Sequence, residues 1–127
     1  PGKFQFSEKE MSKIVEKVEN KIKTQQIKDF ILKRKKKKII VVSHAPIAGI
    51  HDKKDLCHKG FKCFRKFLEK TKPLIWFHGH VHYEGQMNEQ TTRAGDTLVV
   101  NVCGFHIINI INDEIKIVSN IKNFSNI

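Results

Sequence analysis

The sequence is poor in the features that define several large classes of protein. Its three cysteines are too few and too unevenly spaced for a disulfide framework, which favours a reducing, cytoplasmic environment. No apolar run approaches the ~20 residues needed to cross a bilayer, and no signal peptide is recognisable. A glycine-rich phosphate loop, a Gly-x-Ser-x-Gly elbow and internal repeats are also lacking. These absences argue against disulfide-rich secreted proteins, membrane proteins, P-loop enzymes and serine hydrolases.

Acidic residues are scarce relative to basic ones. The chain has 24 Lys and Arg against 13 Asp and Glu, a net charge of +11. Residues 1–38 hold 13 of the basic and 5 of the acidic residues, a net of +8. Within them, residues 33–38 (KRKKKK) form a run of six cations. The run has no aromatic residues for base stacking. We therefore interpret it as the solvated end of a helix, where cations suit the helix dipole; nucleic-acid binding is not favoured.

The amino-terminal third predicts a long amphipathic helix. Ser7 and Glu10 have the spacing of a capping box, in which each side chain binds the other residue's backbone amide, and Phe6 and Met11 stand at the flanking staple positions. We expect one helix over residues 8–33, with a candidate kink near residues 24–26. Its single buried stripe recurs at helical spacing, with a slip of about one residue after Ile22: Met11, Ile14, Val15, Val18, Ile22, Ile27, Phe30 and Ile31.

A strand–helix–strand unit follows in the sequence. Residues 39–42 (IIVV) are all β-branched, which predicts a strand buried on both faces. Residues 74–77 (LIWF) predict a second strand. Between them, Cys57, Phe61, Phe64, Phe67 and Leu68 predict an amphipathic helix that ends before Pro73. Such a unit makes the two strands parallel, with a right-handed crossover.

The rest of the chain predicts further β structure. We expect residues 84–96 to form a polar loop and residues 97–102 to form a strand. Residues 105–111 and 115–119 should pair as a hairpin around a turn at residues 112–113. The Asn- and Ser-rich tail, residues 120–127, is expected to fray. At 127 residues the chain is one domain at most, of the α/β class.

Histidines follow both strands of the predicted βαβ unit. Residues 41–46 read VVSHAP and residues 77–82 read FHGHVH. In a parallel sheet, groups that follow neighbouring strands meet at the carboxyl edge, about 5 Å apart. Imidazole is the commonest protein metal ligand. We therefore predict that His44, His80 and His82 hold one metal ion or a pair.

The remaining histidines and the cysteines fit metal binding less well. His78 could face the core, a substrate or a metal. His51, His58 and His106 are each typical of loop or hydrogen-bonding histidines. Cys57 and Cys63, beside the apolar helix, are interpreted as core thiols, since no paired Cys-x-x-Cys accompanies them. A zincin His pair would lie on a helix. The metallo-β-lactamase pattern His-x-His-x-Asp-His fails at residues 82–83.

At these residues the chain resembles the calcineurin-like metallophosphoesterases. Residues 41–46 look like that family's strand-Ser-His-x-Pro motif, and residues 77–82 look like its strand-Gly-His-x-His motif, in the same order along the chain. The resemblance covers roughly residues 39–119, with a plausible preceding helix in residues 7–33; it continues through Asp52 and residues 60–68, 72–73 and 98–101.

The resemblance implies both a fold and a chemistry. The family has an α/β sandwich and a two-metal centre that hydrolyses phosphomonoesters or phosphodiesters. The resemblance implies that His44 and His80 ligate one metal and that His82 ligates the other. The typical ions are Mn, Fe, Zn or Ni, and nothing in the sequence chooses among them.

The family's three earlier motifs, Asp-x-His, Gly-Asp-x-x-Asp and Gly-Asn-His-Asp/Glu, should precede these two. Residues 1–38 contain one aspartate, Asp29, and no histidine, and the chain begins Pro1-Gly2 without Met. We therefore expect residues 1–127 to be the C-terminal half of the catalytic domain: a helix and basic run in 1–38, the motif-bearing core in 39–119 and a tail in 120–127.

The expected partners are a phosphoester substrate and the N-terminal half of the domain, in the same protein or in another chain. No membrane partner is expected. The half by itself should be inactive, and no catalytic residue is assigned. The alternative hypothesis is a non-catalytic basic module that binds nucleic acid or protein and carries vestigial histidines.

Overall fold

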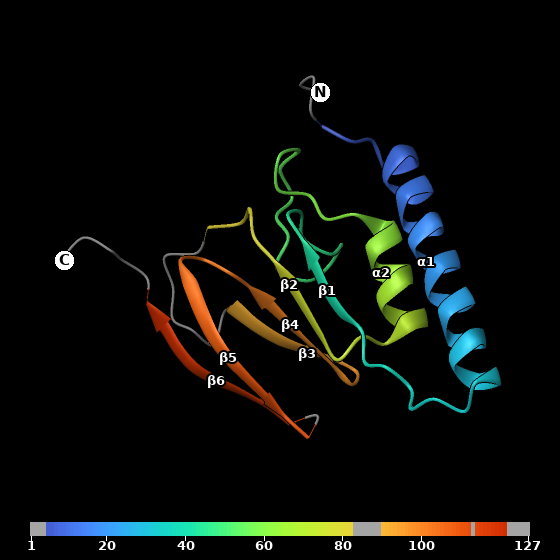
Figure 1. Ribbon diagram of the computed structural model, residues 1–127. Coiled ribbons are helices and arrows are strands. Elements are labelled where there is room, and N and C mark those ends of the chain that lie inside the picture. The colour runs from blue at the N-terminus through green and yellow to red at the C-terminus, as the bar shows by residue number, and fades with distance from the viewer. Residues whose placement is uncertain (1–4, 83–89, 113, 122–127) are drawn as a thin grey trace.

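A computed structural model describes residues 5–82, 90–112 and 114–121. The order of elements is helix α1, then a strand–helix–strand unit, then four strands (Figure 1). Their bounds are α1 Glu8–Ile31, β1 Ile40–Ser43, α2 Lys62–Thr71, β2 Ile75–His78, β3 Thr91–Ala94, β4 Thr97–Asn101, β5 Phe105–Ile111 and β6 Glu114–Ile121. This mixed α/β architecture confirms the predicted fold class.

Helix α1 begins at the predicted capping box, with the Ser7 hydroxyl accepting the Glu10 amide and the Glu10 carboxylate accepting the Ser7 amide. The helix is continuous, with no break near residues 24–26. Glu8 also accepts the amides of Lys62 and Cys63 at 3.1 and 2.7 Å. It thereby caps α2, whose own N-cap residue makes no side-chain bond. Glu8 thus joins the amino ends of the two helices, which run side by side (Figure 1).

The apolar stripe of α1 is only half covered, so the prediction of a fully buried stripe was wrong. Met11, Val15 and Ile22 pack against the core. Ile14 and Val18, by contrast, are more than 40% exposed. Helical periodicity identifies which face is apolar but not how much protein lies against it. Here α2 covers one flank of the stripe and leaves the other open.

The four-stranded sheet has the order β1-β2-β4-β3. β1 and β2 pair in parallel, as the βαβ prediction required, and β2 and β4 are also parallel. β3 pairs antiparallel with β4, which corrects the prediction of a loop over residues 84–96; residues 83–89 lie outside the described chain. The short polar sequence of β3 (TTRA) has too little apolar periodicity to predict an edge strand.

The helices cover one face of this sheet. Trp76 on β2 meets Phe64 and Phe67 of α2 at ring-centroid distances of 5.3 and 5.8 Å. On the opposite face of β1, Ile40 is 50% exposed and Val42 is 77% exposed. The prediction that this strand is buried on both faces was therefore wrong. Four β-branched residues do favour a strand, but β1 is an edge strand of the described sheet and has a helical layer on one side only.

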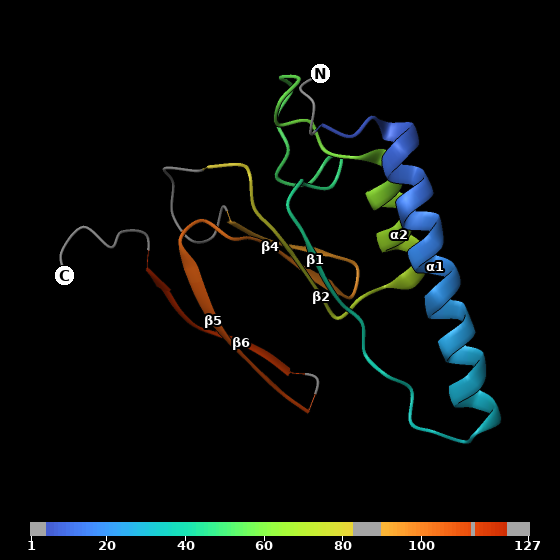
Figure 2. The ribbon, with the colours of Figure 1, turned by 45° about the horizontal axis from the view of Figure 1, so that its top comes forward.

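β5 and β6 form the predicted antiparallel hairpin, which lies on the side of the sheet away from the helices (Figures 1 and 2). β6 runs to Ile121, so it is longer than predicted and includes the first two residues of the expected tail. Residues 122–127 and Asp113 lie outside the described chain. No helix in the described part is long and apolar enough for a membrane span.

The prediction for the basic run is confirmed, whereas the prediction that Cys57 and Cys63 are core thiols holds for Cys63 alone. Residues 33–38 are all exposed, as expected of a solvated basic run. Cys63 is buried, and its burial together with Glu8 raises the pKa of its thiol to about 11, which suits a core thiol. Cys57 is exposed in the loop before α2, so its assignment to the apolar helix and to the core was wrong. Its spacing from Phe61 mimics a helical period across residues that are not helical.

Candidate functional site

The candidate site lies where β1, β2 and β4 end. The sheet register places Ser43, His78 and Asn101 in one row across these three strands. The Trp76 indole donates to the Ser43 hydroxyl at 2.9 Å, and that hydroxyl donates to the Ala45 carbonyl at 2.8 Å. The core therefore fixes the backbone on both sides of His44.

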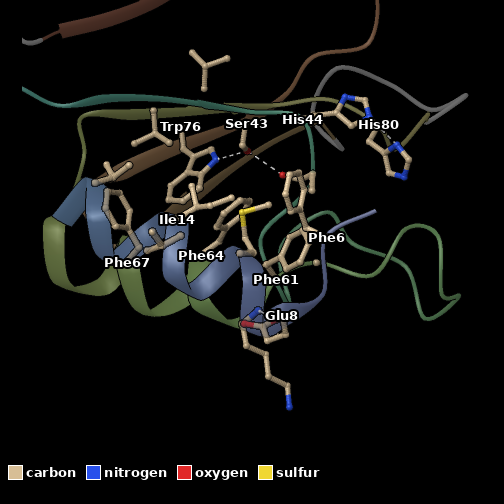
Figure 3. A pocket seen from close by; sticks show the side chains of 18 of the residues that line it. Phe6, Glu8, Ile14, Ser43, His44, Phe61, Phe64, Phe67, Trp76 and His80 are labelled. Atoms are coloured by element: carbon tan, nitrogen blue, oxygen red, sulfur yellow. Dashed lines mark hydrogen bonds between the residues drawn. The ribbon is translucent and has the colours of Figure 1, made fainter. Parts of the chain in front are cut away.

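His44 and His80 lie against each other just beyond this row (Figure 3). His44 Nε2 is 3.0 Å from His80 Nδ1, and the ring centroids are 4.8 Å apart. The two turns are also joined through the backbone, since the Gly79 amide donates to the His44 carbonyl at 3.1 Å. The predicted proximity of these two histidines is therefore confirmed.

His80 occupies a strained turn. Its φ is +70°, in the left-handed region, and the Val81 amide donates to the Gly79 carbonyl at 2.9 Å. A hydrogen bond across three residues with a positive central φ defines a γ-turn of the rare, strained kind. Such a conformation costs about 1–3 kcal/mol and persists only where the surroundings impose it.

A second histidine pair lies beside the first and is made of a buried residue, His78, and a half-buried one, His51. His78 is 1% exposed. Its Nε2 is 3.1 Å from His51 Nδ1, and its Nδ1 is 3.1 Å from the Gly79 carbonyl oxygen. On the far side of His51, its Nε2 is 2.8 Å from the hydroxyl of Thr92 on β3. His51 thus bridges β2 and β3, and itself has a φ of +56°.

Burial keeps this second pair neutral. Desolvation, and then the charge of His78, lower the pKa of His51 to about 4. Desolvation also lowers the pKa of His78, against the opposing effect of the Gly79 carbonyl. Both rings are therefore uncharged at neutral pH, and each nitrogen either donates or accepts one hydrogen bond.

The loop that carries His51 is closed by one carboxylate. Asp52 accepts the Gly49 amide at 3.0 Å and the Gly60 amide at 3.2 Å. Gly60 lies so close to the preceding segment that an added Cβ would sit 2.4 Å from Ala48 N. The same loop brings the Cys57 carbonyl to 2.8 Å from His80 Nε2. One loop therefore contacts both histidine pairs.

The other candidate residues are more dispersed. His82 is exposed, and its Nδ1 is 3.8 Å from the Cys103 sulfur. His58 is bound by Asp55 at 2.7 Å, with its ring 5.1 Å from the His80 ring. His106 departs from the expectation of a loop or hydrogen-bonded residue. It lies on β5, and neither ring nitrogen has a hydrogen-bond partner in the described chain.

The His44–His80 pair fits a metal ion, although incompletely. Two imidazole nitrogens that share an ion at about 2.1 Å lie roughly 3–3.5 Å apart, close to the 3.0 Å found. A ligating histidine normally donates its other N–H to a carbonyl or carboxylate, as His80 Nε2 does to the Cys57 carbonyl. Among residues 5–82, 90–112 and 114–121, however, no three His, Cys, Asp or Glu side chains converge as a metal-binding group. The His44–His80 pair would therefore supply only part of the ligand set that an ion needs.

An apolar groove opens next to this pair. It runs from His44 and His80 between α1 and the edge strand β1, over a floor that includes Trp76 (Figure 3). Phe6 and Ile14 line it and are more than 40% exposed. The groove and the exposed face of β1 leave apolar surface of the described chain uncovered.

The prediction that His51 is a loop or hydrogen-bonding histidine is confirmed by its contacts with His78 and Thr92, although its place at the site was not predicted. Reasoning from the sequence assigned no role at the site to Thr92 or to Asn101, whose buried amide donates to the Val81 carbonyl at 2.7 Å. Asn101 is a polar residue at the end of an apolar strand, and this position in the sequence indicates a candidate site residue. The sequence has no such indication for His51 and Thr92, because only the folded loop brings them together.

Comparison with known families identifies the class of protein that this fold and site represent. The model of the calcineurin-like phosphoesterase family matches residues 5–84, well over half of the 127-residue chain. The chain belongs to the calcineurin-like phosphoesterase family. Searches of curated proteins and of solved structures found no match.

Proposed function

We propose that this chain supplies part of the metal centre of a phosphoester hydrolase, with His44 and His80 as ligands of one divalent ion and His82 as a ligand of a second. The observation that carries the proposal is the 3.0 Å approach of His44 Nε2 to His80 Nδ1 at the carboxyl ends of two parallel strands. Family membership supports hydrolysis of phosphoesters in general.

In this proposal the residues of the chain bind the divalent ions and hold the ligating nitrogens in orientation. The Cys57 carbonyl holds a proton on His80 Nε2, so His80 Nδ1 accepts from His44 Nε2 in the structure, and a bound ion would take the place of that shared proton. When bound, divalent ions offset the charge that develops on phosphoryl oxygens and align the attacking oxygen with the phosphorus. Mn, Fe, Zn and Ni all suit imidazole and carboxylate ligands.

The remaining ligands are proposed to come from a partner segment, the N-terminal half of the domain, in the same protein or another chain. A two-metal centre needs carboxylates that neutralise the ions, and the described residues converge no such group on the His44–His80 pair. The apolar groove beside β1 is where that segment would bury its own apolar surface. Residues 1–127 without it are proposed to be inactive.

Isothermal titration with Mn²⁺ and Zn²⁺ tests the ligand assignment. We expect weak binding by the chain, a loss of at least about tenfold with His44→Ala or His80→Ala, and no loss with the matched control His106→Ala. Hydrolysis of p-nitrophenyl phosphate and bis-p-nitrophenyl phosphate, with Mn²⁺ added, should require the N-terminal half.

Two outcomes would contradict the proposal. Metal-dependent turnover by residues 1–127 alone, abolished by His80→Ala, would show that the site is already complete. Absence of divalent binding, together with salt-sensitive binding to nucleic acid, would favour the non-catalytic basic module instead.

A further inference from the structure

The γ-turn at His80 is held from both sides by buried side chains. On one side His78 Nδ1 is 3.1 Å from the Gly79 carbonyl, which already accepts the Val81 amide. On the other, the Asn101 amide nitrogen is 2.7 Å from the Val81 carbonyl. His78 is 1% exposed and Asn101 is fully buried. Interior side chains therefore bind the Gly79–His80 peptide unit, directly before His80, and the Val81–His82 unit, one residue after it.

The chain of hydrogen bonds from His78 through His51 to Thr92 allows only one arrangement of protons on the ring nitrogens. A carbonyl can only accept, so His78 Nδ1 must carry the proton that it gives to Gly79. His78 Nε2 is then an acceptor, and His51 Nδ1 must donate to it over 3.1 Å. His51 Nε2 must in turn accept from the Thr92 hydroxyl over 2.8 Å. Thr92 and His51 thus fix His78 in the form that can hold the Gly79 carbonyl.

We propose that His78 and Asn101 are positioning residues that clamp the Gly79–Val81 turn, and that His51 sets the tautomer of His78, so that His80 is held with Nδ1 facing His44. The inference builds on the proposed metal role of His80, but the clamp exists without metal. Its purpose is to impose a positive φ on a histidine, a conformation that the isolated turn would not keep. A preformed ligand pair binds an ion without first ordering itself.

The first test needs no metal. Long-range proton–nitrogen NMR of the 127-residue chain should show His78 protonated at Nδ1 and bare at Nε2, and His51 likewise. Nuclear Overhauser contacts should join the His44 and His80 rings. Protonation of His78 at Nε2 would overturn the proposal whatever the metal does.

The second test separates positioning from general stability. His78→Asn keeps an N–H donor near the position of Nδ1, whereas His78→Phe keeps the ring volume without a donor. We expect His78→Phe to lose the His44–His80 ring contacts and about 10–100-fold in Zn²⁺ affinity. His78→Asn should retain most of both at a similar melting temperature. Thr92→Val removes the last donor of the hydrogen-bond chain and should have a smaller effect than His78→Phe, because His51 still contacts His78.

The outcomes distinguish this inference from the proposed function. If a folded His78→Phe keeps the ring contacts, the clamp is wrong. If the wild-type chain shows the Nδ1–H tautomer and the ring contacts but binds no divalent ion, the clamp stands and the metal role of His80 fails. If His78→Phe does not fold, the tautomer in the wild-type chain and the His78→Asn variant decide the question.

Discussion

The two histidine pairs are built at the same edge of the sheet from the same loop and the same strand end, yet their environments differ. His51 and His78 are enclosed, with hydrogen-bond partners beyond both rings. His44 and His80 lie at the surface, and only His80 is tied to the loop, through the Cys57 carbonyl. The ring nitrogens of His51 and His78 all have hydrogen-bond partners within the protein, so this pair suits a structural role. The open pair has nitrogens that can turn to a ligand.

The largest effect should come from a change that disturbs both pairs at once. Gly60→Ala would place a Cβ 2.4 Å from Ala48 N and 2.6 Å from the Ile47 carbonyl oxygen. Backbone atoms cannot yield as a side-chain end can, so we expect a loss of about 3 kcal/mol in the free energy of unfolding. Urea unfolding measures it. Wild-type stability in this variant would mean that the loop is not held against residues 47–48.

Glycine substitution should separate the two pairs. Both His51 and His80 have positive φ values, so glycine relieves strain at either position. His51→Gly also leaves the buried His78 Nε2 without its donor, whereas His80→Gly removes a surface ring. We expect His51→Gly to be less stable than His80→Gly by about 1–3 kcal/mol, in paired unfolding experiments. Equal losses would show that the enclosed pair is no more structural than the open one.

Acid should weaken the enclosed pair. The pKa of His51 is lowered from 6.5 to about 4 in the folded chain, by burial and by His78. Between pH 4 and 6.5 His51 binds a proton in the unfolded chain but not in the folded chain. The free energy of unfolding therefore falls as pH falls from 6.5 towards 4. The shift corresponds to at most about 3 kcal/mol, which solvent screening of the half-buried His51 ring reduces towards about 1 kcal/mol. Unfolding at several pH values, with His51→Gln as the control, checks it; an unchanged slope in the variant would contradict it.

The smallest effect should come from a region remote from either pair. Replacing the lysines of residues 33–38 with glutamine should change the free energy of unfolding by less than about 1 kcal/mol, because these residues are all exposed. The complete enzyme should also keep its activity. A collapse of activity with unchanged stability would instead show that the basic run binds substrate.

The sequence predicted the helices and strands better than it predicted what covers them. The capping box of α1, the parallel βαβ unit and the β5–β6 hairpin are set by local spacing. The burial of Ile40 and Val42 was mispredicted because burial depends on what covers a strand, not on its own residues. β3 was missed because four polar residues at an edge carry almost no pattern.

At the site, the sequence by itself determined that histidines would leave two parallel strands at one edge, because strand direction and the βαβ connection require it. That reasoning brought His44 and His80 together. Only the tertiary structure decided that His78 turns inward to His51, that Asn101 reaches Val81, and that His82 lies by Cys103. Those contacts join residues 20 to 27 positions apart along the chain. Their geometry depends on how a loop folds over a sheet, and no local spacing encodes it.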